Sequence, residues 1–389
     1  MESIWQPWFL ALVPAGFLAG SLVYCVMSMV AAARYRKAGS ASYPDLASVP
    51  ISILKPIHGL DDGLEANLRS FFSQDYRGPD GEPHFEILFA TRDNRDPAIA
   101  VVEKLRAEFP HVSARLLVTG EPPYANAKVF SLDTMQRAAT YDLLAMADSD
   151  VRVDPAFLQT VAADFADPQL GLATCPYRAI AGPSIWSFLE ALHMNTEFLG
   201  GVLTARMIEG VKFALGPTII ARKSVIQDIG GFDELKDFLA EDFVMGNRAA
   251  ERGHGVILSP YVVEHRIGTQ DFRHSMAHRI RWGRSTRRSR PAGYFGEVFL
   301  RPLTLALILV LLAPWAWPAL PATLALRYLQ AEIMRQTVAA TFTWKHWLLL
   351  PIQDLLSFVL WVAGFFGNSI AWRGRRYRLE KDGRFTLEG

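Results

Sequence analysis

Two aspartates separated by one residue, Asp148 and Asp150, follow directly after the apolar run Leu143–Ala147. Such a run is typical of a buried strand, so the two carboxylates stand at a strand end. Paired carboxylates can hold Mg²⁺ or Mn²⁺ from one side, and these cations usually complete their coordination with phosphate oxygens. An isolated Asp-x-Asp is often only a solvated turn. The strand-end position favours a metal site that would neutralise a departing diphosphate.

A second acidic pair, Glu241 and Asp242, stands before a stretch whose apolar residues have helical spacing. One of the two carboxylates could act as a general base, because an alcohol that attacks a sugar carbon must lose its proton as the bond forms. Acidic residues at such a position also stabilise the following helix through its dipole. From this segment alone, both interpretations stay open.

A basic segment, His278–Arg290, contains Arg281 and Trp282. A guanidinium can bind diphosphate oxygens through two parallel hydrogen bonds, and an indole ring offers a flat face to a sugar or a lipid headgroup. The later arginines of the segment are better explained as a patch that attracts anionic lipid. Lys128 is a further candidate for contact with a donor phosphate, although a single lysine is more often a solvated charge.

The elements that would position these side chains lie between residues 44 and 290, where short β-rich runs alternate with stretches of helical spacing. Buried strands are predicted at Ile51–Leu54, Phe85–Phe89 and Leu143–Ala147. This alternation indicates an α/β fold with a mainly parallel sheet, and ligands of such sheets bind beyond the carboxyl ends of the strands. Residues 44–290 are therefore expected to form one catalytic domain.

An uncharged stretch at residues 8–33 is long enough to cross a membrane as a helix. Glu2 precedes it and three basic residues follow it within Arg34–Lys37, an arrangement that argues against a cleaved signal peptide. By the positive-inside rule, the chain from residue 34 onward is expected in the cytoplasm.

A carboxyl-terminal membrane region of two or three segments is predicted at residues 299–372. Leu303–Leu326 could span with kinks at its prolines, and Leu355–Trp372 could span without them. The stretch 331–344 suits either an interfacial helix or a polar-lined third span, because it carries charges among apolar residues. Residues 373–389 are expected to form a basic cytoplasmic tail. The chain is thus predicted to be a multi-pass membrane protein.

Lys and Arg total 40 against 39 Asp and Glu, and this balance indicates no nucleic-acid partner. The two cysteines, Cys25 and Cys175, have neither the spacing of metal ligands nor that of a disulfide framework. They are interpreted as packing residues, which is compatible with a reducing, cytoplasmic setting for the catalytic domain.

Several short motifs follow one another in a fixed order along the chain. They are Ser52–Pro56 with Gly59 and Asp61, Arg92–Ile99, Asn126–Lys128, Asp148–Ser149, Glu241–Asp242, Ile280–Trp282 and Trp372–Leu379. Each motif alone is weak evidence. The ordered set resembles the ceramide glucosyltransferase family of inverting glycosyltransferases, and it covers nearly the whole chain after the first helix.

That resemblance implies a Rossmann-like glycosyltransferase type A domain. It implies that Asp61 and Asp93 lie near the nucleotide, that Asp148 lies near the metal, and that Asp242 is the catalytic base. Asp150 completes an Asp-x-Asp that some eukaryotic members lack.

Arg281 and Trp282 match the end of a family motif written as Gln or Arg, any two residues, Arg, Trp. His278 departs from that motif, since it stands where Gln or Arg is expected.

The function implied by the resemblance is transfer of a sugar, glucose in the first place, from a UDP-sugar to the hydroxyl of a membrane lipid such as ceramide. The expected mechanism is a metal-assisted single displacement with inversion, using Mn²⁺ or Mg²⁺, with the catalytic domain on the cytoplasmic side of a bacterial inner membrane. Bacterial hopanoid-pathway glycosyltransferases share this layout, so transfer of N-acetylglucosamine to a hopanoid lipid is an open alternative. A processive polysaccharide synthase would need a channel, for which the predicted spans are few. A non-catalytic scaffold would not need the carboxylates.

Overall fold

The computed structural model describes residues 8–39, 49–372 and 375–388. Its centre is a seven-stranded sheet with the order β3-β2-β1-β4-β8-β6-β9. These strands are β1 (Ile51–Pro56), β2 (Phe85–Thr91), β3 (Ser113–Val118), β4 (Leu143–Ala147), β6 (Leu170–Thr174), β8 (Thr218–Arg222) and β9 (Gly255–Leu258). The three strands predicted from apolar runs are confirmed as β1, β2 and β4, which are buried along almost their whole length.

The sheet is mixed. Strands β1, β2, β3 and β4 pair in parallel, whereas β8 runs antiparallel to both β4 and β6. Parallel strands put their carboxyl ends at one edge, so the loops after β1, β2 and β4 meet there. This topology confirms the predicted α/β fold with a sheet that is parallel over β1 to β4.

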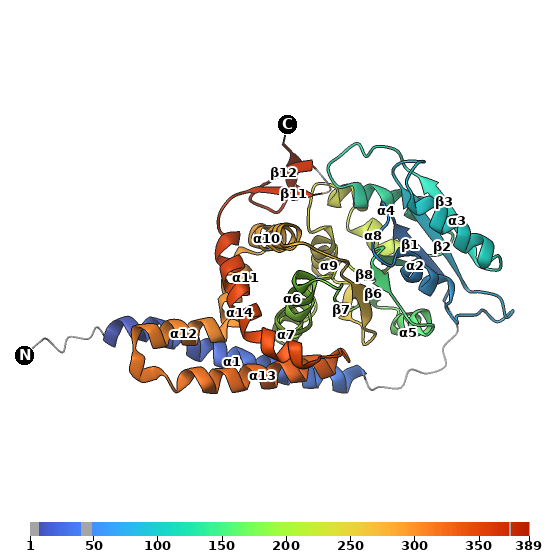
Figure 1. Ribbon diagram of the computed structural model, residues 1–389. Coiled ribbons are helices and arrows are strands. Elements are labelled where there is room, and N and C mark those ends of the chain that lie inside the picture. Colours follow the sequence, from blue (N-terminus) through green and yellow to red (C-terminus); the bar gives the residue numbers. More distant parts are fainter. Residues whose placement is uncertain (1–7, 40–48, 373–374, 389) are drawn as a thin grey trace, which may run out of the picture.

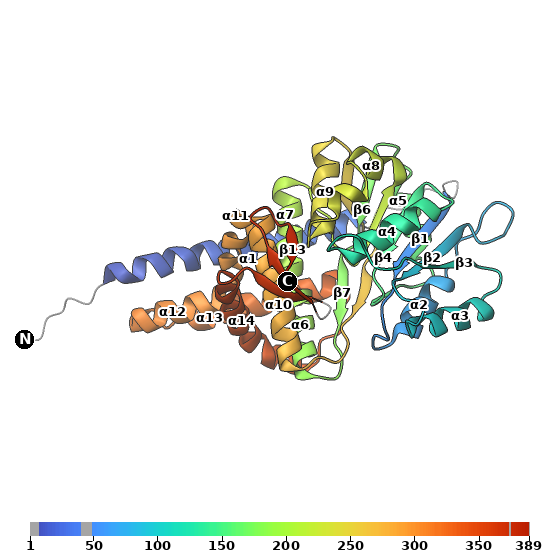
Figure 2. The same ribbon diagram turned by 90° about the horizontal axis from the view of Figure 1, so that it is seen from above.

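Helices cover both faces of the sheet, which explains why its strands are apolar on both sides (Figure 2). One face packs against α4 (Ala127–Ala138), α8 (Lys223–Asp228) and α9 (Glu241–Glu251). The other packs against α2 (Leu64–Phe72), α3 (Ala98–Glu108), α5 (Phe157–Asp164) and α7 (Leu199–Glu209). A short 3-10 turn, η2 (Phe232–Leu235), precedes α9.

A second, three-stranded sheet flanks the carboxyl edge of the main one. It contains β5 (Val151–Arg152), β10 (Val263–Arg266) and β7 (Tyr177–Ile180). Next along the chain, α6 (Ile185–His193) continues through the π-helical turn η1 (Met194–Phe198) into α7. The long helix α10 (Phe272–Ser289) then leads through α11 (Pro291–Gly296) and η3 (Glu297–Leu300) to the membrane region.

The first helix, α1 (Trp8–Gly39), extends beyond the predicted 8–33. Its last turns pack into the core of the α/β domain through Ala32 and Tyr35, and the Tyr35 hydroxyl donates to the carbonyl of Ser259 at 2.7 Å. The helix therefore continues past residue 33 because its last turns are packed against the α/β domain. The predicted start of the catalytic domain at residue 44 lies outside the described residues.

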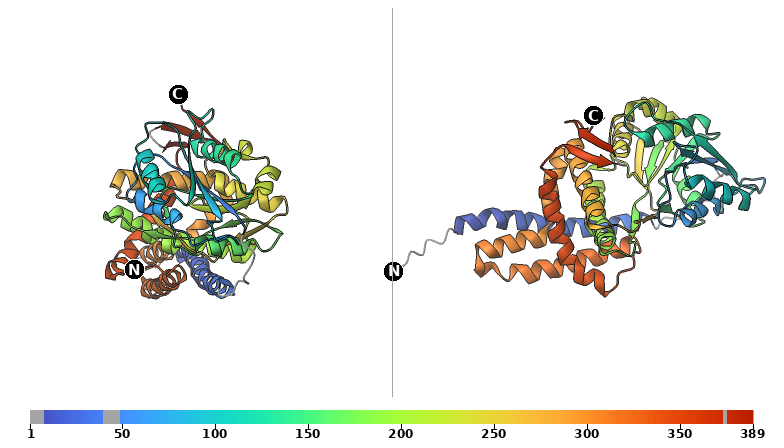
Figure 3. Two further views of the ribbon diagram at one scale, coloured as in Figure 1. Left: turned by 90° about the vertical axis from the view of Figure 1, so that its right-hand side faces the viewer. Right: turned by 45° about the horizontal axis from the view of Figure 1, so that its top comes forward.

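The prediction of one kinked span at Leu303–Leu326 is wrong. The chain forms α12 (Pro302–Leu312), the 3-10 turn η4 (Pro314–Ala316) and α13 (Ala319–Thr337), which folds back alongside α12. Pro314 cannot donate a backbone hydrogen bond to the preceding turn, so the helix ends and the chain reverses. Both helices run beside α1 (Figures 1 and 3). The stretch 331–344 is split between the end of α13 and a non-helical connection.

The predicted span Leu355–Trp372 is also corrected. The helix there, α14 (Trp344–Gly364), begins earlier, and the following residues form strand β11 (Ser369–Trp372). Among the described helices, α1 over Ala11–Gly39 and α14 are each long and apolar enough to cross a membrane. The pair Pro291–Leu300 and Pro302–Leu312, bent by 68°, passes the same test only when taken together.

The segment predicted as a basic tail, 373–389, is folded in its described part. Strand β12 (Arg375–Leu379) pairs with β11 on one side and with β13 (Phe385–Leu387) on the other, in an antiparallel sheet that lies beside α10 (Figure 1). The alternation along β12 explains this, because Tyr377 and Leu379 point into a small core while the arginines face outward. The predicted boundary at residue 373 lies outside the described residues.

Candidate functional site

Three acidic loops lie at the carboxyl edge of the sheet, because β1 lies between β2 and β4 and runs parallel to both. Asp61 follows β1, Asp93 follows β2, and Asp148 follows β4. The Ser149 hydroxyl donates to Oδ2 of Asp61 at 3.0 Å, which joins the first and third loops. Asp93 accepts from the backbone N–H of Arg95 at 2.9 Å. The structure thus places Asp61 beside the Asp148–Asp150 loop and Asp93 at the neighbouring strand end.

Both aspartates after β4 face a basic side chain from another part of the chain. Lys128 Nζ lies 2.7 Å from Oδ1 of Asp148, and His265 Nε2 lies 3.2 Å from Oδ2 of Asp150. Lys55, at the end of β1, is fully buried and donates to the backbone carbonyl of Asp148 at 2.5 Å. The loop is therefore held in place by basic side chains from three different elements.

The charges of these cations depend on how much carboxylate surrounds each one. Burial lowers the pKa of Lys55 to about 7, despite the nearby carboxylates. Burial also disfavours the charged form of Lys128, but Asp148 and Glu241 outweigh it and raise its pKa. At His265 burial is likewise outweighed, here by Asp150, and the pKa is raised. Lys128 is therefore a fixed positive charge at the carboxyl edge of the sheet.

The chemistry of this loop fits a divalent cation that arrives with its diphosphate. Among the described residues, no three His, Cys, Asp or Glu side chains gather to hold a metal ion by themselves. Asp148 and Asp150 can supply two carboxylates, and the buried Oδ1 of Asp150 lacks a hydrogen-bond partner in the described part of the chain. Mg²⁺ is commonly held by one or two carboxylates plus substrate phosphates, so a two-carboxylate site is sufficient.

The second acidic pair begins α9, and its two members have different surroundings. Glu241 is buried, where it accepts from the Asn126 amide at 3.3 Å and lies 3.4 Å from Lys128 Nζ. Asp242 lines a small cavity together with Lys128, Asp148 and Gly216. A side chain at position 216 would crowd this carboxylate, because an added Cβ would stand 2.7 Å from Oδ2 of Asp242.

Asp242 has the protonation behaviour expected of a base near neutral pH. Burial and the adjacent charge of Glu241 raise the pKa of Asp242 to about 7, although Lys128 acts in the opposite direction. A base whose pKa is near the working pH combines a large ionised fraction with a strong tendency to accept a proton. The geometry therefore distinguishes the two acids, since Glu241 is engaged in holding Asn126 and Lys128.

Trp282 is connected to the acidic site by a chain of ring contacts. Its ring lies 6.3 Å from that of Phe198, which stacks on Tyr177 at 5.3 Å, and Tyr177 lies 5.4 Å from His265. The ring of Trp282 also lies 4.7 Å from that of His278. This series of rings connects Trp282 on α10 with His265, which pairs with Asp150.

His278, the position that departs from the family motif, is held by a buried carboxylate. Its Nδ1 lies 2.7 Å from Oε1 of Glu190 on α6. Burial lowers the pKa of His278 in spite of that carboxylate. His278 therefore packs against Trp282 as a positioning residue.

Arg281 lies toward the carboxyl-terminal sheet. Its guanidinium carbon is 5.9 Å from the centre of the Trp372 ring on β11. The folded tail is thus part of the surroundings of the Arg-Trp motif, and this could not be inferred while the tail was interpreted as a free basic segment.

The chain as a whole matches the model of one protein family, glycosyl transferase family 21, over residues 16–385. The protein belongs to this family. Ceramide glucosyltransferase 1 of Caenorhabditis elegans is 28% identical over 224 residues, which is 56% of this chain and 46% of that protein. Ceramide glucosyltransferase of Komagataella phaffii is 38% identical over 107 residues, 26% of this chain and 20% of that one. The predicted resemblance to the ceramide glucosyltransferase family is confirmed.

The family 21 chain spans less than half of the length of these two curated relatives. A solved structure, the mannosyltransferase PcManGT from Pyrobaculum calidifontis in complex with GDP-Man and Mn²⁺, is 18% identical with a TM-score of 0.47. That alignment covers 90% of this chain and 97% of the other.

The roles of several residues that shape the site of this family 21 member were not predicted from the sequence. His265 and Lys55 hold the Asp148–Asp150 loop, and Gly216 leaves room for Asp242. Lys55 is part of the predicted motif Ser52–Pro56 at the end of a strand, but its role in holding the loop after β4 was not predicted. His265 and Gly216 carried none, because their partners lie far away in the sequence.

Proposed function

We propose that this chain transfers glucose from UDP-glucose to the hydroxyl of a membrane lipid such as ceramide, with inversion at the sugar carbon. The proposal is supported by family membership and by the relatives named ceramide glucosyltransferase. The observation that carries it is the small cavity at the carboxyl edge of the sheet, where a carboxylate with a pKa of about 7 faces a permanent cation and the acidic loop after β4.

The donor is assigned to the acidic edge. Asp61 and Asp93 would contact the nucleoside, since they follow the two strands beside β4. A divalent cation, Mn²⁺ or Mg²⁺, held by Asp148 and Asp150 would supply positive charge to the diphosphate. Lys128 adds a fixed positive charge in the cavity that Asp242 also lines.

Arg281 and Trp282 are assigned to the diphosphate and to the sugar or the acceptor, respectively. Arg281 offers a planar pair of donors that matches phosphate oxygens. Trp282 offers an apolar ring whose position is fixed by its contacts with the rings of His278 and Phe198.

In the proposed transfer reaction, Asp242 acts as the general base. The oxygen of the acceptor hydroxyl forms a bond to the anomeric carbon while the bond from that carbon to the diphosphate oxygen breaks. The hydroxyl proton passes to the Asp242 carboxylate, and the electron pair of the broken bond leaves with the diphosphate. Attack opposite the leaving group gives a β-linked product from an α-linked nucleotide sugar.

A lipid acceptor is supported by the way the catalytic domain is built onto apolar helices. The end of α1 forms part of the domain core, and α12 and α13 run beside α1. A lipid alcohol at the membrane surface would therefore reach a domain that is fixed close to it.

Product analysis tests this proposal. The purified full chain in detergent is incubated with a lipid extract and either UDP-glucose or UDP-N-acetylglucosamine, and the products are identified by mass spectrometry. We expect one hexose added to a lipid alcohol, loss of product in Asp148→Ala, and parental activity in Asp167→Ala, which alters an exposed aspartate away from the site. Absence of transfer with every donor, or full activity of Asp148→Ala, would refute the proposal, and repeated addition would indicate a polysaccharide synthase.

A further inference from the structure

Helix α14 presents an apolar stripe to its surroundings. Six large hydrophobic side chains spaced by three or four residues are exposed on it: Trp344, Leu348, Ile352, Leu355, Val359 and Val362. This spacing places them on one face of the helix. Exposed fractions of 69% at Trp344, 62% at Leu348 and 61% at Val359 show that the protein leaves this face uncovered along its length.

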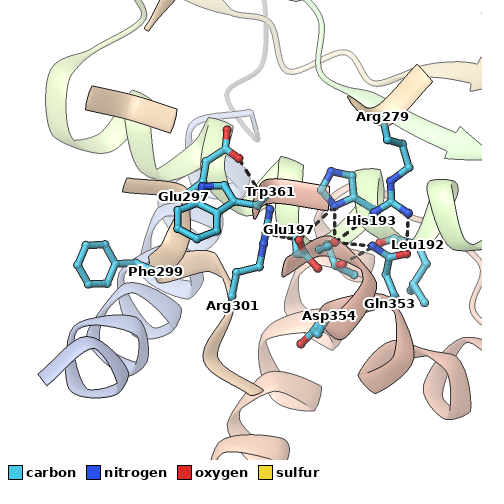
Figure 4. A network of polar contacts seen from close by, with 12 residues as sticks. Leu192, His193, Glu197, Arg279, Glu297, Phe299, Arg301, Gln353, Asp354 and Trp361 are labelled. Carbon is cyan, nitrogen blue, oxygen red and sulfur yellow. Dashed lines mark hydrogen bonds and ion pairs between the residues drawn. The ribbon is translucent and has the colours of Figure 1, made fainter. Parts of the chain in front are cut away.

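The opposite face of α14 is polar, and basic side chains hold it against the protein. Arg279 on α10 donates to Gln353 and to Ser357, each at 3.2 Å. Arg327 on α13 forms a fully buried ion pair with Asp354 at 2.9 Å. Figure 4 shows the guanidinium of Arg279 beside Gln353, with Asp354 on the same helix. Because an unpaired charge in such a site is strongly unfavourable, these bonds fix the rotation of α14 and keep the stripe outward.

The segments on both sides of α14 are hydrogen-bonded to the α/β domain. Just before the helix, the carbonyls of Val338 and Ala339 accept from Arg178 on β7, at 3.2 and 3.0 Å. Just after it, the carboxyl-terminal sheet returns to the domain, where the N–H of Phe385 donates to the carbonyl of Asp237 at 2.8 Å. A helix of 21 residues is about 31 Å long, enough to separate its ends by a whole hydrocarbon core if it crossed.

The direction of α14 agrees with both of its ends lying on the same side of a membrane. It crosses the bundle of α1, α12 and α13 at a steep angle and does not run alongside it (Figure 3). If α1 follows the membrane normal, α14 lies close to the membrane plane.

We propose that α14 lies in the membrane surface as an interfacial helix, with its apolar stripe among lipid chains and its polar face on α10 and α13. The occupant of the stripe is the lipid bilayer, because α14 packs against α12, and α12 runs beside α1, which is long and apolar enough to cross a membrane. Both of these neighbouring helices also leave apolar side chains uncovered, among them Val13 on α1 and Leu311 on α12. Trp344 and Lys345 at its first turn suit the headgroup level, where indole rings and lysine stems are favourable.

The first experiment locates the two ends of α14. Single cysteines replace exposed residues on either side of it, Thr341→Cys and Ser369→Cys, and Asp80→Cys marks the catalytic domain. Sealed membrane vesicles of both orientations, containing the full chain, are treated with an impermeant maleimide, and the parent chain gives the background from its two buried cysteines. We expect all three positions to react from the same side. Reaction of Thr341→Cys and Ser369→Cys from opposite sides would overturn the proposal.

The second experiment measures the depth of the stripe. An environment-sensitive fluorophore is attached at Leu348→Cys or Val359→Cys in vesicles of phosphatidylethanolamine and phosphatidylglycerol that contain lipids spin-labelled near the headgroup or near the chain end. The two positions are 11 residues apart, about 16 Å along the helix. An in-plane helix gives the same ratio of quenching by the two lipids at both positions.

A crossing helix would give clearly different ratios at the two positions, and a stripe covered by a second copy or another protein would be quenched by neither lipid. Either result would refute the proposal. Leu60→Cys serves as the matched control, because Leu60 is 63% exposed on the catalytic domain and should show no quenching by lipid.

Discussion

The role proposed for Asp242 leads to a quantitative pH dependence. A general base works only when it is ionised, and the pKa of Asp242 is raised to about 7 by burial and by Glu241. Activity should therefore be full above that pKa and fall as the pH drops through it. At about pH 6 roughly a tenth of the free enzyme would carry the ionised base, so kcat/KM should fall by about tenfold for each further pH unit.

Replacement of Asp242 by asparagine keeps the shape of the side chain and removes its basicity. A general base contributes about 10² to 10⁴ in rate, or about 3 to 5 kcal/mol of barrier, so Asp242→Asn should lower kcat at least a hundredfold. Donor affinity should change much less, because the groups assigned to the diphosphate remain. The acid limb of the pH profile should disappear with the variant.

The assay follows kcat/KM for product formation from about pH 5 to about pH 9, together with donor affinity by calorimetry and product configuration by NMR. Asp233→Asn is the matched control, because that aspartate is 76% exposed in the turn before α9 and pairs with Lys236. Glu241→Gln should move the acid limb to lower pH, since it removes a neighbouring negative charge.

Three outcomes would refute this reasoning. An unchanged acid limb in Asp242→Asn would mean that another group titrates. Loss of donor binding in proportion to kcat would make Asp242 a binding or structural residue. A product with retained configuration would exclude the single displacement.

Three further predictions follow from other parts of the structure. Chelation should abolish transfer and Mn²⁺ or Mg²⁺ should restore it, with Asp148→Ala more damaging than Asp150→Ala; full activity in excess chelator would contradict this. Gly216→Ala should lower kcat at least tenfold with little change in thermal stability, because the added Cβ would crowd the Asp242 carboxylate. Arg327→Met should destabilise the detergent-solubilised chain by about 3 to 5 kcal/mol, measured by thermal unfolding, since it leaves a buried carboxylate without its partner.

The glycine prediction has a control within the chain. Gly296 has no atom within 4 Å of an added Cβ, so Gly296→Ala should retain parental kcat. Equal kcat for the two alanine variants would show that position 216 does not restrict the site. For the arginine prediction, an unfolding temperature equal to that of the parent would show that the ion pair adds nothing to stability.

Local sequence was sufficient where one segment contains all the information. The strands β1, β2 and β4 were predicted because each is an uninterrupted apolar run, which burial on both faces of a covered sheet requires. The position of Asp148 and Asp150 at a strand end followed from their adjacency to β4. The α/β class and the resemblance to the ceramide glucosyltransferase family likewise depended on the order of segments along the chain.

Local sequence failed where hydrophobicity was the only guide in the carboxyl-terminal region. An apolar run can span a membrane, form a hairpin or lie along the surface, and its composition is the same in each case. The reversal at Pro314, the polar contacts of Asp354 and the strand pairing of Tyr377 decide between these possibilities. Each depends on a partner elsewhere in the chain.

The sequence by itself thus determined the class of fold, the family, the acidic residues at the strand ends and the presence of apolar segments. Only the tertiary structure decided which basic side chain faces each carboxylate, which of Glu241 and Asp242 accepts from Asn126, and how α14 is turned. The physical reason is that strands and amphipathic helices are specified by neighbouring residues. A carboxylate with a shifted pKa is instead produced by charges and burial contributed from distant parts of the chain, as Asp148 and Lys128 illustrate.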